Sequence, residues 1–206
     1  MATQATLEDI EKARWLISHG YIGTDDVHLL ADQLAERRER EKGNKNMKID
    51  PTSIIEYTHQ EFVAGINNIA AQVIASEFKP NLIVGIVRGG AVPAVYLSHK
   101  LKVPVSMVHW STCDKTNALG NESNCWIPEW LLEGKRILLV DDIVDGGDTI
   151  RELLEDWQSS VRDPLPLNNL RISAMYYNTA QATTVDFYHR EIDRNVDQRW
   201  VVFPWE

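Results

Sequence analysis

The chain has 206 residues, of which 44% are hydrophobic and 25% charged, as in an ordinary soluble globular protein. Its formal net charge of −9 disfavours nonspecific binding to nucleic acid or to an anionic membrane, because those partners are themselves negatively charged. The chain has only two cysteines and no segment typical of a signal peptide or a membrane span, so we expect a cytoplasmic protein without a disulfide framework.

The first 48 residues predict a helical appendage that is separate from the main domain. Apolar side chains recur at helical spacing over residues 7–17 and again over residues 27–34. A short linker of Gly, Asn and Lys follows at 43–46. We therefore expect two parts, the helical appendage over 1–48 and a domain over 49–206.

The domain alternates between strand and helix patterns. Thr58 and Glu61 have the spacing of a capping box, which predicts the start of a helix. Leu82 to Val87 is an uninterrupted apolar run, typical of a strand that is covered on both faces. Similar patterns predict helices at 91–101 and 150–157, strands at 103–109, 136–140 and 170–177, and a last apolar segment at 200–203. This alternation predicts an α/β fold with a mostly parallel central sheet flanked by helices.

The most informative segment runs from residue 137 to residue 149. Four apolar residues lead into Asp141 and Asp142, and a third carboxylate follows at Asp145. Acids at the carboxyl end of a parallel strand lie where open α/β sheets bind their ligands. Because adjacent strand residues point to opposite faces, we expect Asp141 and Asp142 to have different roles.

A glycine-rich turn follows the acids and opens the next helix. Gly146 and Gly147 allow close approach of a ligand, and the N–H groups of Gly147, Asp148 and Thr149 are expected to form an anion site. An EF-hand loop is excluded because Ile143 stands at its third position, and no nucleotide-binding glycine motif of Walker or Rossmann type occurs. A purely structural acidic turn remains an alternative, although it explains three carboxylates poorly.

A second apolar strand ends in a similar turn. Residues 84–87 lead into Arg88, Gly89 and Gly90. Arg88 has a permanent positive charge and the bidentate geometry that suits a phosphate. Such a turn is weak evidence alone, but together with the acidic segment it indicates a site for a charged sugar phosphate.

In these two motifs the chain resembles the type I phosphoribosyltransferases. Residues 141–149 are similar to their phosphoribosyl pyrophosphate signature, and 87–90 to their pyrophosphate loop, within a resemblance that covers roughly 50–206. One departure is Gly146, where the family usually has Thr, Ser or another side chain that can contact the 5′-phosphate. The polar stretch over 111–126, part of a polar segment that extends to Glu133, matches the position of the family's flexible lid.

The resemblance implies a role for each residue of the two motifs. Asp141 and Asp142 would hold the ribose hydroxyls, directly or through Mg²⁺, and Asp145 would be the general base beside the purine ring. Phosphate contacts would come from the two turns, with Gly146, Gly147, Asp148 and Thr149 at the 5′-phosphate and Arg88, Gly89 and Gly90 at the pyrophosphate. Arg88 would stabilise the charge that grows on the leaving group, and is therefore a predicted catalytic residue together with Asp145.

The C-terminal tail is similar to that of archaeal and bacterial 6-oxopurine phosphoribosyltransferases. By this resemblance Trp200 stacks on the base, Val201 presents its carbonyl to the edge of the base, and Glu206 lies near the metal. The alternative that Trp200 and Trp205 are only core aromatics stays open. Those relatives have a lysine where this chain has Asn178, whose amide could meet either a 6-oxo or a 6-amino group of the base.

The sequence thus predicts a magnesium-dependent purine phosphoribosyltransferase. It would convert a 6-oxopurine and phosphoribosyl pyrophosphate to a nucleoside monophosphate and pyrophosphate, and it would form a homo-oligomer, as relatives commonly do. Its partners would be these small molecules rather than nucleic acid or a membrane. Two alternatives remain: a non-catalytic regulatory protein on the same fold that binds phosphoribosyl pyrophosphate or a nucleotide, and an enzyme for a pyrimidine or another amide-bearing ring.

Overall fold

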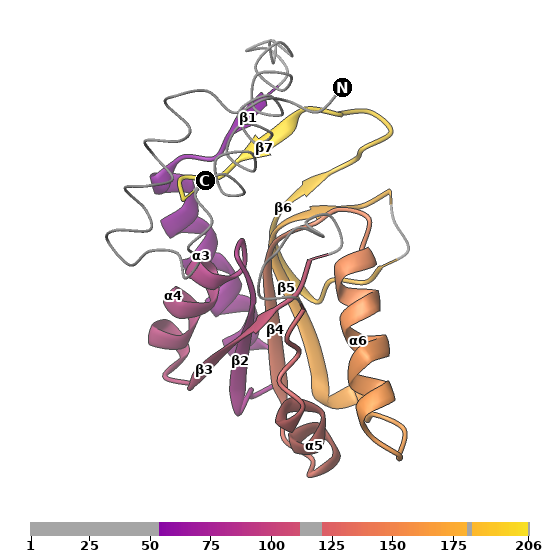
Figure 1. The fold of residues 1–206 in the computed structure, drawn as a ribbon. Coiled ribbons are helices and arrows are strands. Elements are labelled where there is room, and N and C mark those ends of the chain that lie inside the picture. Colours follow the sequence, from indigo (N-terminus) through magenta and orange to yellow (C-terminus); the bar gives the residue numbers. More distant parts are fainter. Residues whose placement is uncertain (1–53, 112–120, 181–182, 206) are drawn as a thin grey trace, which may run out of the picture. The chain divides into compact units, whose positions relative to one another are not determined.

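The central element of the domain is a parallel sheet of five strands, in the order β3-β2-β4-β5-β6 (Figure 1). The structure is a computed structural model that describes residues 54–111, 121–180 and 183–205. The expected helices of the first 48 residues and the terminal Glu206 therefore lie outside the described residues. The strands are β2 (Leu82–Val87), β3 (Val105–His109), β4 (Ile137–Val144), β5 (Leu170–Asn178) and β6 (Phe187–Ile192).

Helices cover both faces of this sheet, which confirms the predicted α/β fold (Figure 1). They are α3 (His59–Ala75), α4 (Ala91–Leu101), α5 (Trp126–Leu132) and α6 (Asp148–Ser160), with a short 3₁₀ helix at Leu167–Asn169. Along β4, Leu138 and Val140 belong to the core beneath α3 and α4, whereas Leu139 belongs to the core beneath α5 and α6. This alternation explains why the strand reads as a continuous apolar run. None of the helices in the described ranges is long and apolar enough to cross a membrane.

The capping box at the start of α3 forms as predicted. The Thr58 hydroxyl accepts a hydrogen bond from the backbone N–H of Glu61 at 3.2 Å, and the Glu61 carboxylate accepts one from the N–H of Thr58 at 3.0 Å. These bonds satisfy two backbone donors that the first helical turn leaves without partners. Phe62 and Ile66 then lie on the face that packs against the sheet.

A separate two-stranded sheet brings the C-terminal tail beside the start of the domain. Strand β1 (Ile54–Glu56) pairs in parallel with β7 (Trp200–Val202), and Ile55 lies opposite Val201. Phe203 continues from β7 into the core, where its ring packs edge-on against Tyr57 at a centroid distance of 5.5 Å. This pairing fixes where Trp200 and Val201 can lie.

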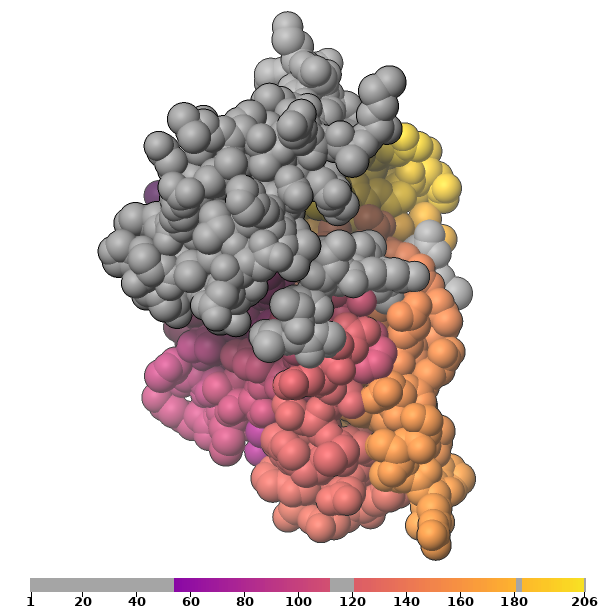
Figure 2. All heavy atoms as spheres, viewed as in Figure 1, coloured from indigo at the N-terminus to yellow at the C-terminus, as the bar shows by residue number. Residues whose placement is uncertain are grey.

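The polar segment between residues 111 and 133, whose first part matches the position of the family's flexible lid, is partly helical. Helix α5 occupies its second half, and the indole N–H of Trp157 in α6 donates to the Ser123 carbonyl at 2.7 Å. The atoms of α5 and α6 lie next to each other on the surface, in red and orange (Figure 2). Ile127 and Leu131 of α5 are fully buried, so the helix is stabilised by tertiary packing rather than by its own short sequence. Residues 112–120 lie outside the described part of the chain.

Candidate active site

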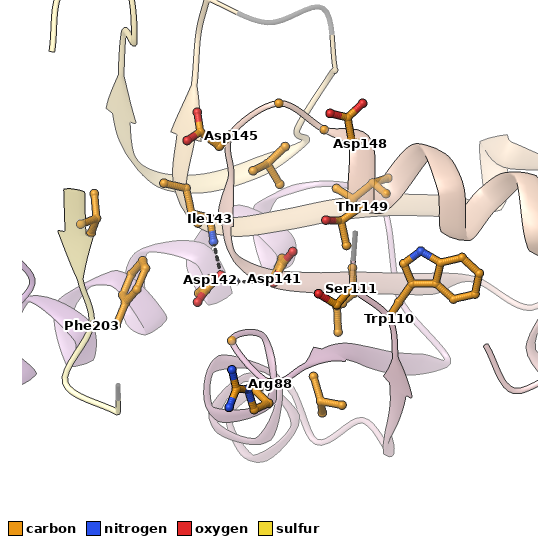
Figure 3. A pocket seen from close by; sticks show the side chains of 18 of the residues that line it. Arg88, Trp110, Ser111, Asp141, Asp142, Ile143, Asp145, Asp148, Thr149 and Phe203 are labelled. Carbon is orange, nitrogen blue, oxygen red and sulfur yellow. Dashed lines mark hydrogen bonds between the residues drawn. The ribbon is translucent and has the colours of Figure 1, made fainter. Parts of the chain in front are cut away.

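A cavity of about 940 Å³ opens beside the carboxyl ends of β2 and β4 (Figure 3). Most of the residues predicted from the motifs line it: Arg88, Gly89, Asp141, Asp142, Asp145, Gly146, Gly147, Asp148, Thr149, Trp200 and Val201. Gly90 and Asn178 do not line it. Glu206 lies outside the described residues, so its predicted place near a metal stays a prediction.

The two adjacent acids lie within β4, which continues past them to Val144. Asp142 is 9% exposed, and its carboxylate accepts a hydrogen bond from the N–H of Ile143 at 2.7 Å (Figure 3). The Asp141 carboxylate accepts one from the N–H of Asp142 at 3.0 Å. Burial, and then the neighbouring charge of Asp142, raises the pKa of Asp141 well above its usual value. A cation or hydroxyl donors at this point would therefore stabilise the ionised pair.

The arginine turn is packed directly against these acids. A Cβ atom at Gly89 would overlap the Asp142 carboxylate, and one at Gly90 would overlap the Val140 carbonyl. Only glycine therefore allows the backbone of the turn to come this close to β4. Gly90 is the N-cap residue of α4, and the Val87–Arg88 peptide bond is cis. The exposed Arg88 side chain faces the cavity (Figure 3).

The turn between β4 and α6 presents backbone donors to the same cavity. Gly147 has a φ of 78°, and a Cβ there would overlap Thr183, so this position requires glycine. Among the described residues, no side chain caps the start of α6. The first turn of a helix has N–H groups without intrahelical partners, and such a helix start suits an anion. Gly146 differs, since an added Cβ would meet only Asp148 Oδ2 at 3.3 Å. Asp148 itself forms an ion pair with Arg151 at 2.5 Å.

Asn178 lies in a different place from the one predicted for it. Its side chain is fully buried, and its amide nitrogen donates to the Asp145 carboxylate at 2.9 Å. Its amide oxygen accepts from the backbone N–H groups of Ala180 at 3.0 Å and Arg194 at 3.2 Å. The amide is thus fully engaged within the protein, and this geometry corrects the expectation that it contacts a base.

Arg194, which carries no motif in the sequence, instead lines the cavity next to Asp145. Its Nε lies 3.1 and 3.2 Å from the two carboxylate oxygens of Asp145. Arg194 belongs to the segment between β6 and β7, so 49 residues separate it from its partner. The only feature of the sequence that could have indicated Arg194 is the presence of a charged residue shortly before the aromatic tail. This feature does not by itself identify a site.

The tail aromatics divide into two groups. Trp200 is 59% exposed and lines the cavity, whereas the buried Val201 anchors β7 beside it. Trp205 stacks on Phe203 at a centroid distance of 5.0 Å and meets Phe62 edge-on at 4.9 Å. Trp205 is half-buried, and besides packing on these core aromatics it also lines the cavity, so the alternative of a core aromatic describes it only in part. Trp200 has the exposure that a stacking residue needs.

The acids suit a cation that is shared with a ligand better than one held by protein alone. Among the described residues, no three His, Cys, Asp or Glu side chains are grouped to bind a metal ion. Mg²⁺ is usually bound through one or two carboxylates together with substrate phosphates and waters. Asp141 and Asp142 at the wall of the cavity offer this kind of donor set.

Comparison with known proteins agrees with this arrangement. The family model described as "Phosphoribosyl transferase domain" matches residues 53–206. A xanthine-guanine phosphoribosyltransferase of Cereibacter sphaeroides is 29% identical over 130 residues, which are 60% of this chain and 68% of that protein. One from Chromohalobacter salexigens is 26% identical over 160 residues, 74% of this chain and 88% of that protein.

Among solved structures, a purine phosphoribosyltransferase from Pyrococcus horikoshii has the same fold. It aligns with a TM-score of 0.53 and 23% identity, covering 75% of this chain and 94% of that one. The family match spans the whole described domain, including both motifs that line the cavity. The chain therefore belongs to the phosphoribosyl transferase domain family and is a phosphoribosyltransferase, as the resemblance of its motifs predicts.

Proposed function

We propose that the enzyme is a magnesium-dependent purine phosphoribosyltransferase that joins a 6-oxopurine, such as guanine, hypoxanthine or xanthine, to phosphoribosyl pyrophosphate. The observation that carries this proposal is one cavity that unites the acidic strand end, the glycine turn of α6, the arginine turn and an exposed tryptophan. The names of the two curated relatives support a purine as the acceptor.

The sugar phosphate would be held by the two ends of the acidic segment. The N–H groups at the start of α6 would bind the 5′-phosphate, because helix N-termini combine free donors with a positive dipole end. Asp141 and Asp142 would accept hydrogen bonds from the ribose hydroxyls or hold a divalent cation. Fixing the sugar at both ends places its anomeric carbon for attack by the ring nitrogen of the base.

The leaving group would lie against the arginine turn. Arg88 would stabilise the charge that develops on pyrophosphate as the bond to the sugar breaks. When bound, Mg²⁺ would neutralise part of the same charge. The close contact between Gly89 and Asp142 links this turn to the ribose acids, so the two ends of the breaking bond are positioned by one rigid unit.

The base would lie between Trp200 and the end of β4. Trp200 would stack on the ring, and the backbone of Val201 would meet one edge of it. Asp145 would accept the proton that the purine loses, as a carboxylate held in one orientation by Asn178 and Arg194. A cytoplasmic location and a homo-oligomeric state stay predictions from the sequence.

A pyrophosphate-release assay tests the proposal. The enzyme is given phosphoribosyl pyrophosphate and Mg²⁺ with guanine, hypoxanthine, xanthine, adenine, uracil or orotate in turn. We expect turnover with at least one 6-oxopurine and its loss when the metal is chelated. Turnover only with a pyrimidine would support the other acceptor class, and binding without turnover of any base would support the regulatory alternative.

Two matched variants connect the activity to this cavity. Asp145→Asn removes the predicted base, and a proton-transfer group of this kind usually contributes about 10²–10⁴-fold to the rate. Asp163→Asn makes the same chemical change in an exposed loop and should leave the rate unaltered. Equal rates for the two variants would exclude the proposed role of Asp145.

A further inference from the structure

This inference rests on the proposed function and concerns how the site selects its base. Of the described residues that line the cavity, two are arginines, and they come from different ends of it. Arg88 lies in the turn that follows β2, whereas Arg194 comes from the segment that leads into β7 and Trp200. Arg194 thus belongs to the part of the cavity where a base would stack.

Arg194 is held by side-chain contacts with two residues and by one backbone contact. Its Nε donates to both oxygens of Asp145 at 3.1 and 3.2 Å. Its Nη1 donates to the Arg199 carbonyl at 2.5 Å, and its backbone N–H donates to Asn178 at 3.2 Å. The side chain is only 17% exposed, so little conformational entropy remains to be lost when a ligand binds.

The guanidinium nevertheless keeps unused donors. A guanidinium has five N–H groups, and within the described part of the chain Nη2 donates to no partner. A guanidinium can only donate hydrogen bonds, so a carbonyl oxygen fits beside it and an amino group does not. Asn178 cannot supply this selectivity, because its amide is buried and engaged on both sides.

We propose that Arg194 is the specificity-determining residue of the base site, and that its free N–H groups bind a carbonyl oxygen on the edge of the purine. The residue thereby selects 6-oxopurines against 6-aminopurines. Loss of a hydrogen bond from a charged donor lowers affinity on the order of 10- to 100-fold. The competing explanation is that Arg194 acts only by orienting Asp145, in which case every base would be affected alike.

The test compares Arg194→Gln with Arg199→Gln. Arg199 lies in the same segment and has an ion pair of its own, with Asp197 at 2.7 Å, but it does not line the cavity. In Arg194→Gln we expect kcat/KM for guanine, hypoxanthine and xanthine to fall about 10- to 100-fold, mainly through KM. The KM for phosphoribosyl pyrophosphate should not change, and adenine should not be penalised as a substrate or as a competitor. Arg199→Gln should behave as the unmodified enzyme.

Arg194→Lys provides a rescue, because it keeps a charged donor and should recover part of the preference for oxopurines. An equal loss for oxo and amino bases in Arg194→Gln would overturn the proposal and assign Arg194 to the support of Asp145.

If no base turns over with the unmodified enzyme, the proposed function fails separately. Equilibrium binding of GMP and AMP to the same variants would then decide the role of Arg194: an unchanged GMP-to-AMP ratio overturns it, and a ratio that falls about 10-fold or more supports it.

Discussion

Replacing Asn178 with alanine is expected to destabilise the domain as well as to disturb the site. The side chain is fully buried at the end of β5, and its amide joins three segments of the chain. It donates to Asp145 and accepts from the N–H groups of Ala180 and Arg194. Alanine would leave two backbone donors and one carboxylate without these partners.

The magnitude follows from the bonds that are lost. Asp145 keeps its ion pair with Arg194, so the two backbone donors are the groups left unsatisfied. Each such group costs about 1 kcal/mol or more, so the two together reduce the free energy of unfolding by about 2 kcal/mol. For a domain of about 150 residues, each kcal/mol lowers Tm by about 2–4 °C. We therefore expect Asn178→Ala to lower Tm by about 4–8 °C.

Thermal unfolding followed by circular dichroism measures this effect, with Asn81→Ala as the control. Asn81 is an exposed asparagine whose side chain accepts one hydrogen bond, from the N–H of Arg136 at 2.9 Å, so its loss should cost less than about 1 kcal/mol. Equal Tm values for the two variants would refute the reasoning. Asn178→Lys distinguishes two roles of this residue. If the residue met the base, lysine would favour 6-oxopurines, whereas the buried network predicts loss of stability.

Three further changes test the phosphate turn, the base site and the core. Gly146→Ser should lower the KM for phosphoribosyl pyrophosphate, because there is room for a side chain and the hydroxyl adds a donor. Gly147→Ser should instead abolish activity, because the φ of Gly147 is 78° and its added side chain would overlap Thr183. Trp200→Ala should raise the KM for the base by about 10-fold or more without changing Tm, since stacking contributes about 1–3 kcal/mol and the residue is 59% exposed. Burial lowers the pKa of His189, so below about pH 6.5 the unfolded chain binds a proton that the folded domain does not. Stability is therefore lost as the pH falls, and the loss of Tm from pH 7.5 to 5.5 should be smaller in His189→Gln.

The parts of the fold that were predicted are those whose pattern is local. The apolar runs of β2 and β4 and the capping box of α3 can be recognised in the sequence, because each depends only on residues that are close together in the chain. Strand β1 has three residues and forms only because β7 pairs with it. Strand β6 carries polar side chains at its centre, and α5 is short, so tertiary contacts rather than local sequence decide both.

The same distinction applies to the site. The acidic segment and the arginine turn are continuous in sequence, and the cavity brings them together as predicted. The contact between Asp145 and Arg194 joins residues that are 49 positions apart, through a turn whose path no local pattern indicates. Asn178 follows the predicted strand over 170–177 and is the last residue of β5, but its partners, and so its role, depend on that same turn.

The acids that line the cavity differ in how their negative charge is balanced. Asp145 pairs with Arg194 and Asp148 pairs with Arg151, so a cationic side chain balances each of these two carboxylates. For Asp141 the balance is the opposite, because burial and the adjacent carboxylate raise its pKa. A negative charge at that position is therefore costly until a ligand brings hydroxyl donors or a cation to it. In the proposed reaction, contacts of the ribose with Asp141 would lie beside the bond that breaks, where their free energy can be used to orient the sugar.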